Sequence, residues 1–248
     1  MSLSRLICGD ATDSCVANTA LDHLSNSIAR FSEKSINYLN NPFSEEAESF
    51  GAFCARVTLE NACAALVGRL DPFRILYLTE YQSQSGFEYG KPVKSGFKWT
   101  GDVLSEDKPT KDLWSADHDI AKISRALFSP HVDHVYWRPA TEAALDYLAA
   151  YTGEGDLTEL KKADPEAFIG KTKGRCAAIY STLSKGVHWE FFTSAVTMDE
   201  GTLKDTLRDC LLQVGTLGFF SHFVSTSYRA LEKDVALAAY LEFRGKFQ

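Results

Sequence analysis

Apolar residues along most of the chain recur every three or four positions, which is the spacing of one face of an α-helix. The first such stretch runs over residues 13–40, and Asn41-Pro42 ends it because proline disfavours helical geometry in the residue before it. Ser44 is a good helix cap and is followed by two glutamates, whose charge suits the first turn of a helix. We therefore expect a second helix over residues 44–70.

Asp71-Pro72 marks the next break, since aspartate caps helices and proline is tolerated at their first position, and residues 73–83 continue as a helix. Arg138-Pro139 is a further start signal, and Asp199-Glu200-Gly201 is the expected turn before the last part of the chain. The later helices are expected over residues 117–128, 139–151, 172–192, 202–225 and 227–243. The pattern predicts an all-α helical bundle, with residues 1–248 forming a single domain.

Two further expectations concern the interior. The helix over residues 44–70 should bury apolar side chains that include Phe50, Phe53, Val57, Ala64, Leu66 and Val67. The six cysteines form no C-x-x-C pair and mostly lie among apolar residues, so we expect them to be reduced and mostly buried: Cys8, Cys15, Cys54, Cys63, Cys176 and Cys210.

Residues 84–116 carry no helical period and are rich in glycine and proline, which predicts a long loop inserted in the bundle, with room for a short hairpin over residues 89–99. Long loops within compact domains are usually functional or mobile. Four aromatic side chains in this loop either anchor it on the helices, which we favour, or stack on a base or a peptide: Phe87, Tyr89, Phe97 and Trp99.

Hydrophobic residues make up 45% of the chain, which is ample for a core. The longest aliphatic runs fall far short of the roughly eighteen residues that cross a bilayer. The N-terminus lacks the apolar region of a secretory signal. We therefore expect a folded, soluble protein of the cytoplasm with no membrane span.

The net charge of −7 opposes non-specific attraction to nucleic acid or to anionic membranes. Residues 161–188 depart from this balance with six basic side chains and two acidic ones. Either this is an ordinary solvated surface, or it is a local patch that binds RNA or another anion. The residues that would form the patch are Lys171, Lys173, Arg175 and Lys185.

A metal site is a weaker candidate. His131 and His134 lie close in sequence, and with Asp133 and His118 they could hold a metal ion, but no H-E-x-x-H or second matching pair of ligands is present. The chain also lacks the phosphate-binding, dinucleotide-binding and serine-hydrolase motifs. We therefore expect no cofactor and no bound metal.

Tyr180, Ser184 and His188 are spaced four residues apart and share one face of the expected helix, and Gly186 would let another helix approach that face closely. The structural interpretation is a packing seam, in which the imidazole is satisfied by a hydrogen bond to a neighbouring helix or to Ser184. The functional interpretation makes His188 a general base or phosphate contact, with Arg175 and Lys185 stabilising an oxyanion.

The run from Tyr180 to His188 reads Y-x-x-L-S-x-x-V-H and resembles the late helix of HEPN-type proteins, which are all-helical domains of bacterial toxins, ribonucleases and phage-defence systems. The resemblance implies metal-independent RNA cleavage by an arginine and a histidine a few residues apart, brought together across a dimer. Here Arg175 precedes His188 by thirteen residues, which is about 20 Å along a helix, so the two cannot act together within one helix. Arg125 and His131 have a closer spacing, but Pro130 is expected to end the helix between them.

Two functions follow. The first is a HEPN-like, non-catalytic interaction or dimerisation module of a bacterial defence or toxin-type system, with a second copy or another protein as its partner. The alternative is an RNA-binding protein or endoribonuclease that uses His188 as its catalytic residue together with Arg175 and Tyr180.

Overall fold

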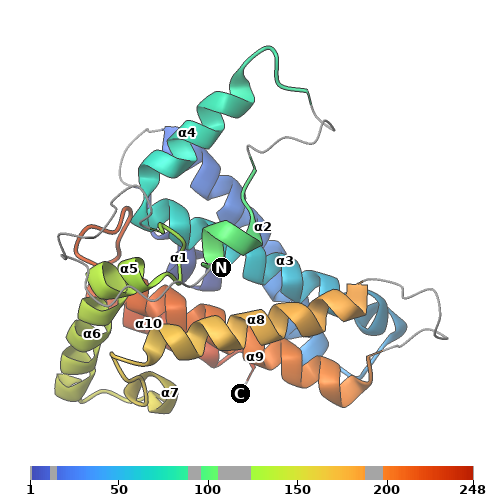
Figure 1. Cartoon of the computed structure of the whole chain (residues 1–248). Helices are drawn as coiled ribbons and strands as arrows, with labels where there is room; N and C mark the ends of the chain where they lie inside the picture. The colour runs from blue at the N-terminus through green and yellow to red at the C-terminus, as the bar shows by residue number, and fades with distance from the viewer. Residues whose placement is uncertain (1, 12–15, 89–95, 106–123, 188–197, 248) are drawn as a thin grey trace.

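The computed structural model describes residues 2–11, 16–88, 96–105, 124–187 and 198–247. About 74% of these described residues are helical, and no strand occurs among them, so the all-α prediction is confirmed. The helices pack around a shared apolar core (Figure 1). They are α1 (Ser2–Cys8), α2 (Val16–Asn40), α3 (Glu45–Leu70), α4 (Pro72–Ser83), α5 (Pro130–Val132), α6 (Arg138–Ala150), α7 (Thr158–Lys161), α8 (Phe168–Val187), α9 (Glu200–Ser221) and α10 (Lys233–Arg244).

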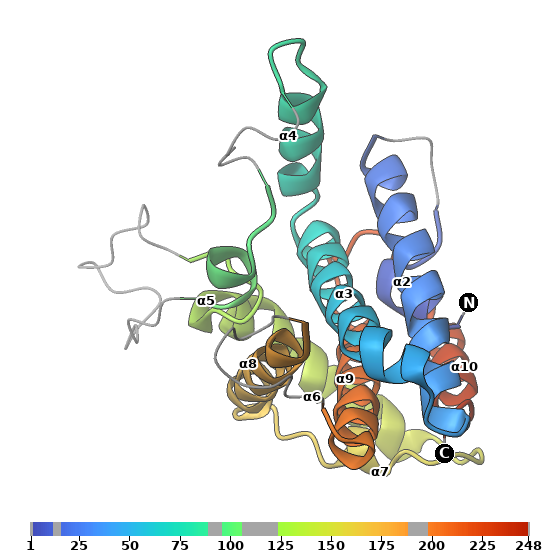
Figure 2. The ribbon, with the colours of Figure 1, turned by 90° about the vertical axis from the view of Figure 1, so that its right-hand side faces the viewer.

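Helix α3 is the centre of the bundle and contacts α1, α2, α8 and α9 (Figure 2). It begins where the sequence predicts, because the Ser44 side chain accepts a hydrogen bond from the Ala47 amide at 3.1 Å. By length and composition α3 is the one helix in the described part of the chain that could cross a membrane, but 61% of its most apolar window is buried inside the fold. Core helices pass the same test.

The prediction that Phe50 and Phe53 are buried is wrong, since they are 55% and 42% exposed. Leu66 and Val67 are buried as expected. The first half of α3 turns small residues inward, so that a Cβ added at Gly51 would lie 2.9 Å from Leu203 on α9. Small inward residues let the helices approach closely, and the phenylalanines are left on the outer face.

Helix α1 was not expected, because seven residues are too few to show a helical period. It is almost entirely buried against α2, α9 and α10. The fully buried Arg69, in the last turn of α3, holds it by donating a hydrogen bond to the Ile7 carbonyl at 3.0 Å. The same guanidinium donates to the Tyr228 carbonyl, between α9 and α10, at 2.9 Å. Arg69 also donates to Ser221 and to Nδ1 of His222. The C-terminal ends of α1, α3 and α9 therefore meet at this guanidinium, where their dipoles favour a positive charge.

Several boundaries in the second half of the chain differ from the prediction. Residues 124–128 are not helical, and residues 117–123 lie outside the described chain. Ser129 is extended, as expected before a proline, but Pro130 then begins a helix instead of ending one, with the Ser129 side chain as its cap. This helix continues through Asp133–Trp137 in a wider π-helical turn and into α6. Arg138-Pro139 is therefore inside a helix, where the wide turn accommodates the proline.

Helix α8 covers the start and middle of its predicted range, and α9 begins earlier than expected because Asp199 caps it through the Thr202 amide at 2.9 Å. The last helix begins at Lys233 and not near residue 227. The intervening segment turns sharply, with Arg229 at a φ of 58°. Five cysteines are free and buried, as predicted, and Cys15 lies outside the described residues. Burial raises the pKa of the Cys8 and Cys176 thiols to about 12, which leaves them protonated and unreactive at neutral pH.

Candidate functional site

The side chain of Tyr180, on α8, contacts both Trp99 and Arg56. Its ring stacks on Trp99 with a centroid separation of 4.5 Å and an interplanar angle of 9°. Arg56 of α3 lies over the same ring at 4.7 Å and donates a hydrogen bond to the Tyr180 hydroxyl at 2.8 Å. Stacking and cation–π contacts of this kind fix the ring in place. Trp99 thus anchors the loop on the helices, as the favoured interpretation of its aromatics predicts.

The expected close approach at Gly186 is confirmed, because a Cβ added there would lie 2.8 Å from the Cβ of Ala52 on α3. Ser184 donates its hydroxyl hydrogen to the Tyr180 carbonyl at 2.7 Å, within its own helix. His188 lies outside the described residues, because α8 is described only as far as Val187. The described part of the seam is therefore packing surface and internal hydrogen bonding.

The basic residues predicted to form one patch lie on different sides of α8. Arg175 is exposed and pairs with Asp209 of α9 at 2.5 Å. Lys173, two residues away and hence on nearly the opposite side of the helix, donates to the carbonyl of Ser105 at 3.1 Å. Lys171 lies on the Arg175 side, and Lys185 is exposed near the C-terminal end of the helix.

Lys171 and Arg175 line a cleft of about 340 Å³ between α7, α8 and α9. Lys162 adds a third basic side chain to this cleft, but Glu159, Asp164 and Asp209 line it as well. The charges of the six residues cancel, so the cleft has no net attraction for a phosphate. Because Tyr180 packs toward α3 and Trp99, it does not join Arg175 in a common site.

The two histidines considered for a metal site that the structure describes, His131 and His134, differ in their exposure. His131 is 7% exposed and His134 is on the surface. Desolvation by burial raises the pKa of Asp133, which opposes its use as a charged ligand. His118 lies outside the described residues. Within the ranges that the structure describes, no three His, Cys, Asp or Glu side chains are placed to hold a metal ion.

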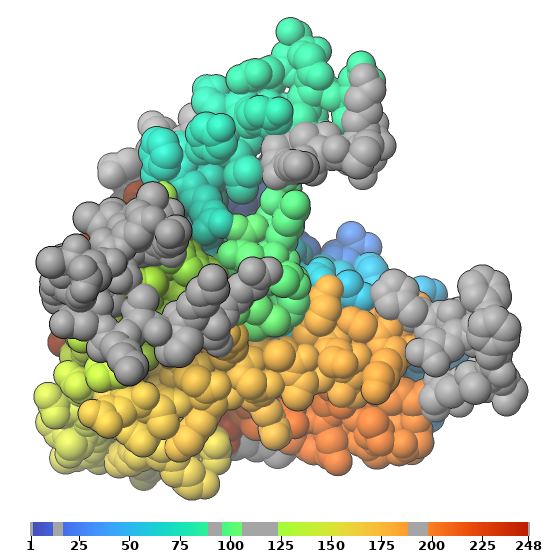
Figure 3. Space-filling view, viewed as in Figure 1, coloured from blue at the N-terminus to red at the C-terminus, as the bar shows by residue number. Residues whose placement is uncertain are grey.

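Helix α4 presents the most exposed apolar surface of the described chain. None of its twelve residues is buried. Phe73, Tyr77 and Tyr81 are 66%, 60% and 41% exposed, and the first two rings stack with centroids 6.3 Å apart. Figure 3 shows α4 projecting as an arm from the body of the molecule. A continuous apolar surface on a projecting element is typical of a protein-binding site.

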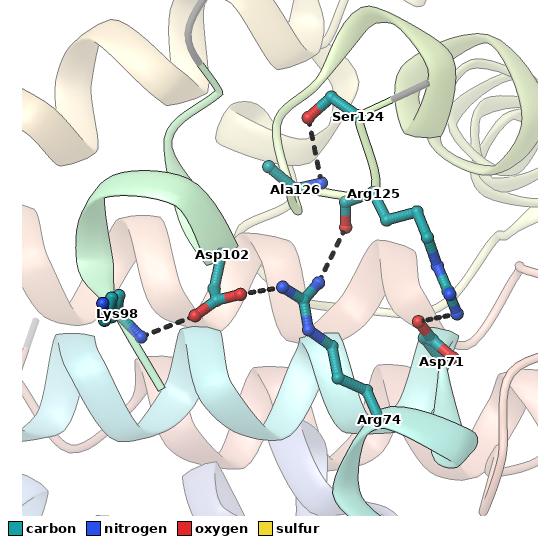
Figure 4. Close-up of polar contacts among 7 residues, drawn as sticks. All are labelled: Asp71, Arg74, Lys98, Asp102, Ser124, Arg125 and Ala126. Carbon is teal, nitrogen blue, oxygen red and sulfur yellow. Dashed lines mark hydrogen bonds and ion pairs between the residues drawn. The ribbon is translucent and has the colours of Figure 1, made fainter. Parts of the chain in front are cut away.

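The base of this arm is fastened by a network of charged groups (Figure 4). Arg74, in the first turn of α4, forms an ion pair with Asp102 and donates to the Arg125 carbonyl at 3.3 Å. Arg125 in turn pairs with Asp71. The expectation that the Asp71 side chain caps α4 is wrong, since its carboxylate makes no capping bond and serves Arg125 instead. The network fixes where the arm leaves the bundle.

The sequence contained a signal for this surface. Phe73, Tyr77 and Tyr81 follow a spacing of four, while Ile75, Leu76 and Leu78 supply the opposite sides of the same helix. Apolar side chains on two sides of a short helix need cover on both sides, and none of the residues of this projecting helix is buried. Comparisons with protein-family models, with curated proteins and with solved structures gave no match to this chain.

Proposed function

We propose that the protein is a non-catalytic helical interaction module that binds a second copy of itself or a partner protein through α4. The observation that carries the proposal is the exposed aromatic face of Phe73, Tyr77 and Tyr81 on a helix without a buried residue. A helix of about twelve residues is marginal in water without tertiary support. A partner that covers this face would stabilise α4 and remove its apolar surface from water.

The α8 residues support the same conclusion. The Tyr180 hydroxyl accepts a hydrogen bond from Arg56, and the Arg175 guanidinium pairs with Asp209, so both groups have structural partners. Gly186 packs closely on α3. We retain the HEPN-like assignment and the bacterial defence or toxin-type setting as part of the proposal, on the strength of the all-helical fold and the Y-x-x-L-S-x-x-V-H run.

The test is site-specific photo-crosslinking in the producing cells from position 77, with position 50 as the control. Phe50 is 55% exposed, close to the 60% of Tyr77, but lies on α3 away from the arm. A cross-linked product from position 77 and none from position 50 is expected, and its mass distinguishes a second copy from another protein. Equal products from both positions, or none, would contradict the proposal.

A second measurement addresses affinity. The double variant Phe73→Ser/Tyr77→Ser should fold with stability within about 0.5 kcal/mol of the parent, since both side chains are exposed. It should lose association by a factor of about 30 or more, because exposed aromatic anchors often contribute about 2 kcal/mol or more each at interfaces. Association is measured by sedimentation velocity, or by binding to the partner identified by cross-linking. A double variant that associates as tightly as the parent would contradict the proposal that α4 is the binding surface.

The alternative function is RNA binding or metal-independent RNA cleavage with His188, and the Y-x-x-L-S-x-x-V-H run is the observation in its favour. Purified protein incubated with total cellular RNA, with and without a chelator, tests it directly. Cleavage that persists with chelator and disappears in a folded His188→Ala variant would show that the protein is an enzyme and not a non-catalytic interaction module.

A further inference from the structure

A separate cavity of about 220 Å³ lies where the end of α3 meets residues 124–127 and the helix that begins at Pro130. Most of its wall is apolar, formed by Val67, Leu70, Leu127, Val132, Val135 and Tyr136. An apolar protein cavity of about 150 Å³ is enough to hold benzene. The space here therefore accommodates one aromatic ring with a short substituent.

One side of the cavity is polar and carries Asp71, Arg125 and His131. Arg125 and Asp71 form an ion pair in which the arginine side chain is 62% exposed and the aspartate side chain is 19% exposed. The cation is thus the accessible member of the pair. A guanidinium has five N–H donors in a planar fork, so it can bind a second carboxylate through two parallel hydrogen bonds.

The guanidinium of Arg125 is not needed to hold its own segment in place. Its backbone carbonyl accepts the hydrogen bond from Arg74 (Figure 4). The amides of Leu127 and Phe128 donate to the carbonyls of Asp102 and Val103 at 2.9 and 3.1 Å. These backbone contacts position the segment, and the Arg125 side chain is left at the rim of an apolar cavity.

We propose that this cavity binds a small aromatic carboxylic acid. The ring occupies the apolar part between α3 and the helix that begins at Pro130, and the carboxylate pairs with Arg125 at the rim. An anionic ligand fits better than a cationic one, because the guanidinium is the more exposed member of the ion pair at the rim. The site shares the Arg125–Asp71 ion pair with the network at the base of α4, but Phe73, Tyr77 and Tyr81 do not line it.

The probes are 3-phenylpropionate and its neutral analogue 3-phenylpropionamide, whose shapes match. Binding is measured by ligand-observed NMR at up to about 10 mM, a range suited to weak small-ligand binding. We expect the acid to bind about tenfold more tightly than the amide, the difference typical of one charge-assisted pair. Failure of the acid to bind, or equal affinity for the two probes, would overturn the proposal.

Three variants locate the effect. Arg125→Gln should lower affinity for the acid to that for the amide and leave amide binding unchanged. Asp71→Asn removes the competing carboxylate and should tighten binding of the acid. Val135→Trp should abolish binding of both probes, since Val135 lines the cavity and is 49% exposed, so the larger ring can fill the space from its mouth.

The matched control is Arg208→Gln, on α9. Arg208 is 49% exposed and, like Arg125, pairs with an aspartate, but it does not line the cavity. It should retain the parental affinities for both probes. If Arg208→Gln lowered the affinity for the acid as much as Arg125→Gln does, the effect would come from overall charge and the assigned site would be wrong.

Discussion

Replacing Gly186 by alanine tests how closely α8 packs on α3. The added Cβ would lie 2.8 Å from the Cβ of Ala52 and 3.1 Å from the terminal methyl of Met198. Carbon atoms in good contact are about 3.5 to 4.0 Å apart. The end of the methionine can rotate away, but the Ala52 Cβ is attached to the α3 backbone, so the two helices must move apart.

Overpacking of this kind costs about 1 to 3 kcal/mol. Alanine also favours the helix over glycine by up to about 1 kcal/mol, which offsets part of that cost. We therefore expect Gly186→Ala to lower the free energy of unfolding by about 1 kcal/mol. Gly174→Ala is the matched control, since Gly174 is exposed on the same helix and no atom lies within 4 Å of an added Cβ. It should raise the free energy of unfolding by about 0.5 to 1 kcal/mol.

The two variants should thus differ by roughly 2 kcal/mol, or by roughly 4 to 8 °C in Tm for a chain of this size. Urea denaturation followed by circular dichroism measures the difference. Adding Ala52→Gly to Gly186→Ala removes the clash, so the pair should show a favourable coupling of about 1 kcal/mol or more in a double-mutant cycle. If Gly186→Ala stabilises the protein as much as Gly174→Ala, α8 does not pack closely on α3 at this position.

Other predictions concern charged and titratable groups. Arg69→Met should lower the free energy of unfolding by about 3 to 5 kcal/mol in urea denaturation, because the buried guanidinium donates hydrogen bonds to four acceptors where α1, α3 and α9 meet; a loss below about 1 kcal/mol would refute its role. Burial and the nearby Arg69 charge lower the pKa of His222 from 6.5 to about 3. The unfolded chain therefore binds a proton below pH 6.5 that the folded chain does not. As the pH falls from 6.5 to about 3, this group should therefore reduce the free energy of unfolding by up to about 1.4 kcal/mol per pH unit. His222→Gln should remove that dependence on pH. Arg175→Gln should change stability by less than about 1 kcal/mol in thermal denaturation, since its pair with Asp209 is exposed; a larger loss would show that the pair is structural.

Local signals predicted the helices well where they were strong. The Ser44 cap and the breaks at Asn41-Pro42 and Asp71-Pro72 act on neighbouring residues only, so they hold whatever the rest of the chain does. Signals that depend on distant contacts failed. Helix α1 is too short to show a period and is stabilised by packing and by Arg69, which lies about sixty residues away along the chain.

The candidate site was predictable only in part for the same reason. The sequence placed Tyr180 and Gly186 on a packing face, because their spacing follows helix geometry, and the structure has them against α3. It could not show that Arg175 pairs with Asp209 and that Lys173 turns toward Ser105. A run of basic residues along a helix divides among several faces, and its net effect depends on which acids lie opposite each one.

By itself, the sequence determined that this chain forms a helical bundle with an inserted loop, since helical periodicity, caps and breaks are written in short stretches. Only the tertiary structure decided which apolar faces are covered. Phe50 and Phe53 are left outside because small residues bring α3 and α9 together on the other side, and α4 keeps its aromatic face exposed because it projects beyond its neighbours. Hydrophobicity measures the tendency of a side chain to leave water, whereas burial also requires another element to be within reach.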